Sequence, residues 1–206
     1  ADHGALLVPP SSDLSARCII FLAQIGFDNA HPAIRRGLIY LTQEQEKDGS
    51  WFGRWGTNYI YGTWSVLSAL NAAGEDMQAG FVRDAVDWLF TVQHEDGGWG
   101  EDCASYWQNH DQNNFPLSLP SQTAWAVLGL MAAGESKSEA VKKGIQFLLD
   151  TCQDDGDWQE EHFNAVGFPR VFYLRYHGYR LYFPLLALAR YQNLENTNTD
   201  RPAFGL

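Results

Sequence analysis

The sequence predicts an all-α fold, an α/α toroid that makes up part of a barrel of paired outer and inner helices. Three related segments end in Asp-Gly-X-Trp, at 36–51, 84–99 and 143–158. Each is followed by an apolar helical pattern, at 61–75, 121–135 and 182–193. Amphipathic helices that alternate with wholly apolar ones predict an outer and an inner layer. About three and a half pairs are present, whereas a closed barrel needs roughly six.

The ends of the inner helices carry recognisable signals. An additional inner helix is predicted at 12–26, with Ser12 or Asp13 as its N-cap. Gly26, Gly74 and Gly134 follow inner helices and are predicted to end them in the left-handed conformation. The polar segment 103–118 lengthens the second interval between repeats and is predicted to be an inserted loop.

The loops between the layers share a Gln and a Trp. Asp-Gly reverses the chain, so Gln45 and Gln93 are expected at the ends of outer helices, with their amides on unpaired carbonyls. The rings of Trp51, Trp99 and Trp158 are expected to lie against these amides as structural side chains. Cys152 takes the place of the third Gln, with Gln153 beside it, which predicts a weaker or shifted contact there.

Composition excludes several classes of function. The chain has 206 residues and a net charge of −11, which argues against a nucleic-acid partner. Its three Cys have no spacing typical of metal ligands, so we expect reduced thiols, no metal and no cofactor. Neither a signal peptide nor a run long enough to span a membrane is visible, which predicts a cytoplasmic location. Eight Trp suggest an aromatic surface with a use beyond packing.

Four stretches together identify a family: "DGSWFGRWGTNYIYGTW", "DGGWGEDC", "QTAWAVLGLMAAGE" and "GFPRVFYLRYHGYRLYFPLLALARY". They closely resemble the C-terminal part of bacterial squalene–hopene cyclases, and the repeats resemble the QW motif of those enzymes and of oxidosqualene cyclases. The resemblance implies a terpenoid cyclase-like fold of two α/α barrels that is monotopic on the cytoplasmic side of the bacterial membrane. It also implies an isomerase that cyclises squalene to hopene or hopanol.

Family members are much longer, so the resemblance makes residues 1–206 a single C-terminal domain, a fragment of a two-barrel enzyme. The implied partners are squalene or a related isoprenoid hydrocarbon, the membrane surface and the missing N-terminal portion. Exposed edges of a partial toroid also predict aggregation or a homodimer.

The resemblance carries over a set of aromatic site residues. Trp55 and Tyr61 match active-site positions of the family, as do Phe168, Phe172, Tyr176 and Tyr179. If the chain is helical past Pro169, the last four share one face at i,i+3 and i,i+4 spacing. The alternative is that all six are ordinary core aromatics, which is the commoner meaning of this spacing.

The acid chemistry of the family is only partly present. Its proton donor lies in a D-x-D-D motif, which this chain lacks, so the chain alone is predicted to be inactive. Asp154, Asp155 and Asp157 have a different order and are predicted to be solvated turn residues.

Asp13 and Arg17 match a family D-x-x-x-H pattern in which the His supports the catalytic Asp. Arg cannot pass on a proton near neutral pH, so a positioning role with Asp13 holding Arg17 is the remaining functional interpretation. A plain N-cap with a helix ion pair is equally compatible with the sequence.

Two other functions stay open. The first is a non-catalytic lipid-binding or structural half-barrel, because the proton donor is missing. The second is a prenyltransferase-like barrel with zinc, for which Asp102, Cys103 and His110 are the nearest candidates. Asp102 and Cys103 are adjacent rather than in the D-x-C spacing of that class, so the zinc site is not expected.

Overall fold

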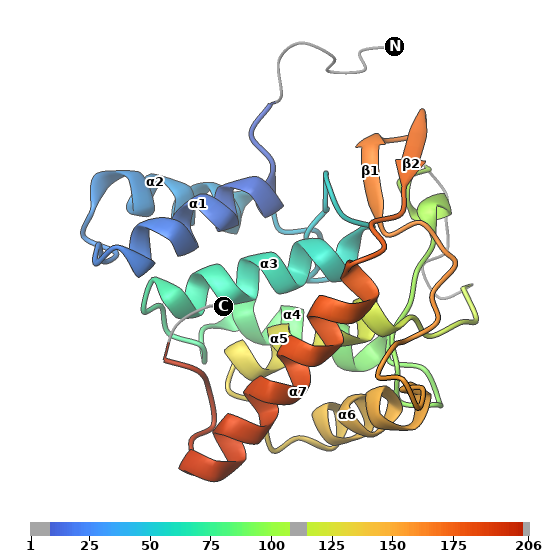
Figure 1. The fold of residues 1–206 in the computed structure, drawn as a ribbon. Helices are drawn as coiled ribbons and strands as arrows, with labels where there is room; N and C mark the ends of the chain where they lie inside the picture. The colour runs from blue at the N-terminus through green and yellow to red at the C-terminus, as the bar shows by residue number, and fades with distance from the viewer. Residues whose placement is uncertain (1–8, 108–114, 204–206) are drawn as a thin grey trace.

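The computed structural model describes residues 9–107 and 115–203, and its elements there are helices and one short hairpin. The inner helices are α1 (Ser12–Gln24), α3 (Tyr59–Ala72), α5 (Pro120–Ala132) and α7 (Tyr179–Thr197). The outer helices are α2 (Pro32–Gln43), α4 (Gly80–Thr91) and α6 (Glu139–Thr151). Each inner helix packs against the next, so α1, α3, α5 and α7 form a row (Figure 1). The predicted all-α double layer is confirmed.

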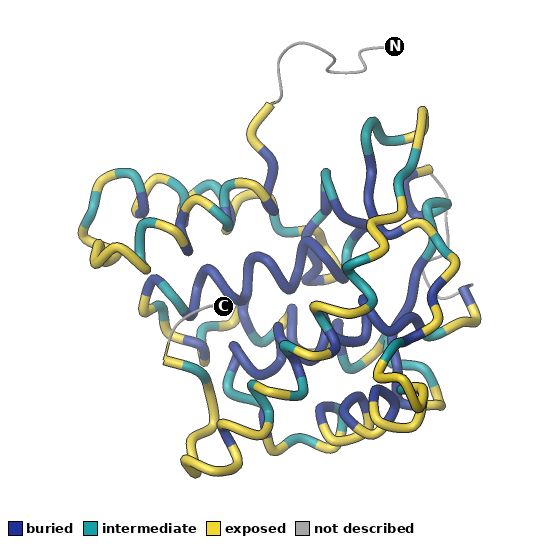
Figure 2. The backbone as a smooth tube through the Cα atoms, viewed as in Figure 1, coloured by how far each residue is buried: buried dark blue, intermediate teal, exposed yellow. Residues whose placement is uncertain are grey.

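Burial follows the two sequence patterns. Almost every residue of α3 and α5 is buried, as their all-round apolar sequences require, and Figure 2 shows α3 as a continuous buried tube. The outer helices bury one face only. The two ends of the row are less covered, because α1 and its C-cap residue expose Phe21 and Ile25, while α7 exposes Tyr182 and Leu185. No helix in the described residues is long and apolar enough to cross a membrane.

The repeat Trp side chains fasten each loop to the outer helix before it. Each indole Nε1–H donates to a carbonyl in the last turn of that helix, at 2.7 Å (Trp51 to Leu41), 2.8 Å (Trp99 to Leu89) and 2.8 Å (Trp158 to Leu148). These carbonyls have no partner within the helix, so the indole satisfies them. The Trp therefore performs the role that the sequence led us to expect of the Gln.

The Gln side chains reach forward instead. The Gln45 amide donates to the Gly49 carbonyl at 2.8 Å and to the Phe81 carbonyl, in the first turn of α4, at 2.7 Å. The Gln93 amide repeats both bonds, to Gly97 at 2.8 Å and to Ala140 at the start of α6 at 3.0 Å. Each Gln thus ties its loop to the outer helix of the following repeat.

The turn glycines of the first two loops support the same contact. Gly49 and Gly97 have positive φ, and a Cβ on them would lie 2.5 Å from the Asp84 carbonyl oxygen and 2.8 Å from that of Lys143. Gly156 in the third loop also has positive φ, but a Cβ there would meet no described atom within 4 Å. The Cys152 thiol donates to the Gln153 carbonyl at 3.7 Å, and no described residue of another helix forms a hydrogen bond with it. The weaker third contact was correctly predicted.

The segment after Pro169 is a hairpin, so the helix considered there is wrong. β1 (Ala165–Phe168) pairs antiparallel with β2 (Phe172–Leu174), and Phe168 lies opposite Phe172 in the register. Arg170 turns the chain with a φ of 64°. An isolated bridge between Gly56 and Ala165 joins this hairpin to the first loop. The aromatic spacing at 168–176 therefore reflects strand pairing and a loop, and not a helical face.

Helix ends agree with most of the predicted signals. Gly26, Gly74 and Gly134 have positive φ directly after the C-cap residues of α1, α3 and α5. The N-cap of α1 is Ser11, so the prediction of Ser12 or Asp13 is wrong by one or two residues. Of the predicted loop 103–118, residues 103–106 form the short 3-10 helix η1 (Cys103–Tyr106), and 108–114 lie outside the described residues.

Candidate functional site

A cavity of about 260 Å³ lies between the start of α1 and the first loop. Its walls are Asp13, Leu14, Arg17, Trp55 and Tyr61, so it brings together four residues that the sequence had singled out. Trp55 comes from the loop, Tyr61 from the first turn of α3, and the other three from α1. The cavity is the point at which all these elements meet, and we take it as the centre of the candidate site.

Asp13 holds the loop that carries Trp55. Its side chain is buried, and its Oδ2 accepts hydrogen bonds from the backbone N–H groups of Arg54 at 3.1 Å and Trp55 at 2.8 Å. Its Oδ1 accepts from the Ser11 hydroxyl at 2.5 Å and from the Leu14 N–H at 2.9 Å. Four donors therefore occupy this carboxylate, and they fix the loop backbone against α1.

Arg17 lies on the aromatic rings rather than on Asp13. Its guanidinium is 4.5 Å from the centroid of the Trp64 ring and 5.7 Å from that of Tyr61, which is cation–π geometry. The ion pairs found in the described residues include neither Asp13 nor Arg17, so the helix ion pair considered for them is not formed. Burial raises the pKa of Tyr61 above its ordinary value, and Arg17 opposes that rise.

Trp55, Phe168 and Phe172 form one aromatic group, which we call the hairpin group. The Arg54 guanidinium lies 4.5 Å from the Trp55 centroid and 5.6 Å from that of Phe168. Phe168 and Phe172 meet edge to face across the hairpin, with centroids 5.4 Å apart. The Val166 N–H donates to the Trp55 carbonyl at 3.0 Å and keeps hairpin and loop together.

Tyr61, Tyr176 and Tyr179 belong to a second group, the inner-row group, which lies on α3, α5, α7 and the loop directly before α7. Tyr61 lies 5.0 Å from Trp125, which lies 5.9 Å from Tyr179. Tyr179 in turn lies 5.0 Å from Tyr176. The structure therefore divides the six predicted aromatics into two groups, and the cavity between Trp55 and Tyr61 is where the groups meet.

Three aromatic members of the inner-row group were not identified from the sequence: Trp64, Trp125 and Phe183. The rings of Trp64 and Trp125 are stacked, with centroids 6.0 Å apart, and Phe183 packs edge-on against both. Trp64 follows Tyr61 by three residues, and Phe183 follows Tyr179 by four, so helical spacing was a usable signal. The indole N–H groups of Trp55, Trp64 and Trp125 are buried without a hydrogen-bond partner among the described residues.

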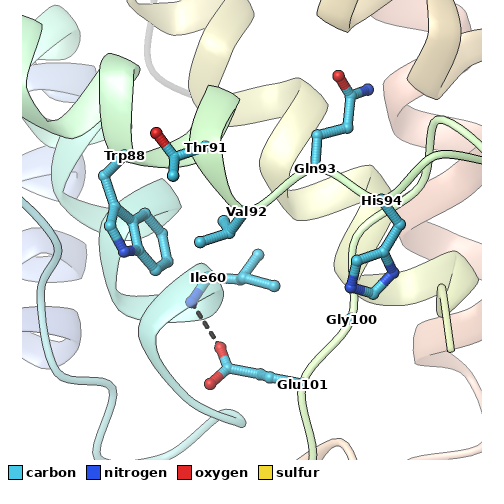
Figure 3. A pocket seen from close by; sticks show the side chains of 8 residues that line it. All are labelled: Ile60, Trp88, Thr91, Val92, Gln93, His94, Gly100 and Glu101. Atoms are coloured by element: carbon cyan, nitrogen blue, oxygen red, sulfur yellow. Dashed lines mark hydrogen bonds between the residues drawn. The ribbon is translucent and has the colours of Figure 1, made fainter. Parts of the chain in front are cut away.

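A buried carboxylate controls the start of α3. Glu101 lines a separate cavity of about 280 Å³, and Figure 3 shows its side chain directed at Ile60. Its Oε1 accepts from the N–H groups of Ile60 at 2.7 Å and Asn58 at 3.1 Å. Burial raises the pKa of this carboxyl to about 7, although these hydrogen bonds act in the opposite direction. Glu101 therefore caps the helix whose first turn presents Tyr61 to the site.

Glu160 has the same relation to α5. It stands two residues after Trp158, as Glu101 stands two after Trp99, and its carboxylate accepts from the N–H and hydroxyl of Ser121 at 2.9 and 2.8 Å. Both glutamates are buried, although their polar sequence context is typical of a solvated loop. The shared position two residues after the repeat Trp was the signal that could have found them.

The remaining acidic and metal-binding predictions have mixed outcomes. Asp154 and Asp155 are exposed turn residues, whereas Asp157 forms an ion pair with Arg180 at 2.7 Å. The Asp102 side chain accepts from the Ala104 N–H at the start of η1. His110 lies outside the described residues, and within 9–107 and 115–203 no cluster of three potential ligands for a metal ion is found.

A solved structure of similar shape supports the fold. A possible member of the GH105 family from Salmonella enterica serovar Paratyphi A superposes with a TM-score of 0.61 at 18% identity, over 96% of this chain and 62% of that one. At this identity the similarity concerns the fold alone.

Sequence comparison gives the family. Residues 1–193 match the model for the squalene–hopene cyclase C-terminal domain. The chain is 54% identical to the squalene–hopene cyclase of Zymomonas mobilis over all of its length, and 58% identical over 99% to that of Schizosaccharomyces japonicus. It spans 31% of the length of either relative. The chain therefore belongs to the squalene–hopene cyclase family, and its match is to the C-terminal domain.

Proposed function

We propose that this chain is the C-terminal portion of a squalene–hopene cyclase, an isomerase, and that its aromatic groups stabilise carbocations while squalene is cyclised to hopene or hopanol. The observation that carries the proposal is the cavity between Trp55 and Tyr61, which joins the hairpin group to the inner-row group. Membership of the family supplies the reaction class.

The chemistry of such a substrate explains why the site is aromatic. Squalene has no polar group, so its recognition depends on shape and on apolar area, at about 25 cal/mol per Å² buried. A carbocation intermediate needs negative potential without a base that would remove its proton too early. An aromatic face offers this, and each desolvated contact contributes about 0.5–2 kcal/mol.

The chain provides only part of the substrate cavity in this proposal. The cavity of about 260 Å³ is smaller than the roughly 300–1,000 Å³ usual for drug-sized ligands. Phe172 and Tyr176 are 44% and 49% exposed, which suits side chains that a further wall would cover. We infer that the remaining portion of the enzyme supplies that wall together with the D-x-D-D proton donor.

The exposed apolar residues at the ends of the row fit the same proposal. Phe21 is 60% exposed on α1, and Tyr182 and Leu185 are 68% and 64% exposed on α7. Such faces suit contact with the rest of the enzyme, with a second copy, or with the cytoplasmic surface of the membrane, to which the whole enzyme is proposed to attach peripherally.

The test is a product analysis with squalene. The isolated chain is expected to form no cyclised product, and detection of hopene by mass spectrometry would contradict this. In a full-length cyclase that carries this sequence, Trp55→Ala and Phe172→Ala should each redirect cyclisation to altered or incomplete products.

A matched control is Trp107→Ala, since Trp107 is 56% exposed and belongs to neither aromatic group. It should leave the product ratio unchanged. A full-length protein that binds squalene but never cyclises it would favour the alternative, a non-catalytic lipid-binding half-barrel, which the absence of D-x-D-D in this chain keeps open.

A further inference from the structure

Asn164 connects the two aromatic groups through both its backbone and its side chain. It is 1% exposed and directly precedes β1. Its backbone carbonyl accepts from the N–H of Thr57, two residues after Trp55, at 3.3 Å. Its side-chain Oδ1 accepts from the N–H of Tyr176 at 2.9 Å, and its Nδ2 donates to the Tyr176 carbonyl at 3.3 Å. One residue thus holds the Trp55 loop and Tyr176 at a fixed separation.

Glu160 fixes the orientation of this amide. The Asn164 Nδ2 donates to Glu160 Oε1 at 3.0 Å as well as to the Tyr176 carbonyl. The reversed amide would place its oxygen against a carboxylate and a carbonyl, and its NH₂ against the Tyr176 N–H, so only one orientation satisfies all three partners. Glu160 is itself anchored by Ser121 at the start of α5.

Tyr176 in turn sets the beginning of α7. The N–H of Tyr179 donates to the Tyr176 carbonyl at 3.0 Å, while the N-cap residue Gly178 has no side chain to cap the helix. The first turn of α7 therefore takes its position from the residue that Asn164 holds. That turn carries Tyr179, which packs against Tyr176 at 5.0 Å and against Trp125 at 5.9 Å.

We propose that Asn164, oriented by Glu160, is a positioning residue that sets the separation of the hairpin group and the inner-row group, and hence the product ratio of cyclisation. The inference rests on the proposed cyclase function. The cavity at Trp55 and Tyr61 is lined by neither side chain, so both act through the residues they hold. A displacement of about 1 Å of the aromatic walls is enough to change turnover about 100-fold.

The experiment uses a full-length cyclase that carries this sequence as its C-terminal part. Asn164→Ala removes all three side-chain bonds, and Asn164→Asp places a carboxylate against Glu160 while it keeps the acceptor for Tyr176. The double variant Asn164→Asp with Glu160→Gln restores a donor opposite the new acid. Asn71→Ala is the matched control, since the buried Asn71 amide also ties two segments, through the Pro202 carbonyl at 3.0 Å, but at the far end of α3.

Two readouts are needed. We expect Asn164→Ala and Asn164→Asp to lower kcat about 10- to 100-fold with KM within about twofold, and to raise the share of incomplete products. The double variant should recover at least part of the wild-type ratio relative to Asn164→Asp. Amide hydrogen exchange should accelerate at 176–183 in the single variants and stay unchanged there in Asn71→Ala.

The outcomes separate this inference from the function on which it rests. A folded Asn164→Ala enzyme with the wild-type product ratio, or wild-type exchange at 176–183, overturns the positioning role. If the unmodified enzyme forms no cyclised product, the proposed function fails. The exchange measurement then still decides whether Asn164 positions Tyr176 and the start of α7.

Discussion

The loop after Trp51 and the loops after Trp99 and Trp158 are each joined to an inner helix by a buried acid. The acid belongs to the helix in the first case and to the loop in the other two. In the later two, a buried glutamate two residues after the Trp reaches out and caps an inner helix. In the first, Gly53 occupies that position, and Asp13 of the preceding inner helix reaches into the loop and binds its backbone.

This reversal distinguishes the first repeat, at which we propose the site, from the two repeats whose loops cap inner helices. A loop that supplies the capping acid must point that side chain inward at the helix. A loop whose backbone is held by an acid from the helix has its own side chains free. Trp55 follows directly from this arrangement, since its N–H is bound to Asp13 while its ring lines the cavity.

The largest change in unfolding free energy is expected from the protonation state of Glu101, the buried acid of the second loop. Folding raises the pKa of Glu101 from 4.5 to about 7, so the folded state binds more protons in that window and loses stability as pH rises through it. The full difference amounts to about 3 kcal/mol. Glu101→Gln should abolish this part of the pH dependence, as measured by urea unfolding at about pH 5 and about pH 8.

The control for Glu101 is the exposed residue Glu95 on the same loop. Glu95→Gln should leave the difference in unfolding free energy between the two pH values as it is in the wild type. If Glu101→Gln keeps the wild-type pH dependence as well, Glu101 is not the buried acid that controls the second loop.

A smaller effect is expected in the first loop. Asp13→Asn leaves one acceptor oxygen where four donors now converge, and it turns an NH₂ group toward backbone N–H groups. We expect a loss of about 1–3 kcal/mol in unfolding free energy. Release of the loop should also shift the emission of Trp55, which is isolated by subtracting the fluorescence spectrum of the Trp55→Phe variant.

Asp28→Asn is the matched change at an exposed site, where the Asp28 side chain accepts a hydrogen bond from the Ala30 N–H. Its cost should stay within about 0.5 kcal/mol. Equal losses for Asp13→Asn and Asp28→Asn would show that the first loop does not depend on the acid from α1.

The smallest effects are expected at the position, Gln45 in the first repeat and Cys152 in the third, from which a Gln side chain can tie its loop to the next outer helix. Gln45→Ala should cost about 1 kcal/mol, because two neutral hydrogen bonds are lost at a partly buried position. Cys152→Gln should change the stability by less than about 0.5 kcal/mol, because a Cβ on Gly156 would meet no described atom within 4 Å and no outer helix follows this loop in the described residues. Changes of equal size at the two positions, seen in chemical denaturation, would remove the distinction between the loops.

The repeat pattern was sufficient to predict the fold. A helix that is apolar all round would expose apolar side chains in the outer layer, and an amphipathic helix would bury charged ones in the inner layer. The resemblance placed Asp13, Arg17, Trp55 and Tyr61, which indeed meet at one cavity. The aromatic spacing at 168–176 did not predict the secondary structure correctly. Residues four apart share a face of a helix, but they can equally lie opposite each other in a hairpin with a tight turn. Arg170 makes that turn with a left-handed backbone conformation, which an arginine in a sequence does not predict.

The buried acids were harder to foresee. Glu101 and Glu160 stand among Gly, Asp and Gln residues, a composition typical of solvated loops, and their partners include backbone N–H groups, which leave no trace in the sequence. Asn164 is hidden for the same reason. Its role depends on the carbonyl and N–H of Tyr176, which almost any residue at that position would offer.

The forward reach of Gln45 and Gln93 also determines where the chain can change its length. Each amide joins a loop to the next outer helix, so it connects the two ends of the chain segment that contains the intervening inner helix. The additional segment 103–118 lies between Gln93 and Ala140 in the chain, so both of its flanks are tied to outer helices. Its first residues also hold the Trp55 loop, because the Tyr106 hydroxyl donates to the Gly53 and Gly56 carbonyls at 2.8 and 2.7 Å. An insertion that leaves these bonds and the Gln93 bond intact would therefore also leave the backbone beside Trp55 in place.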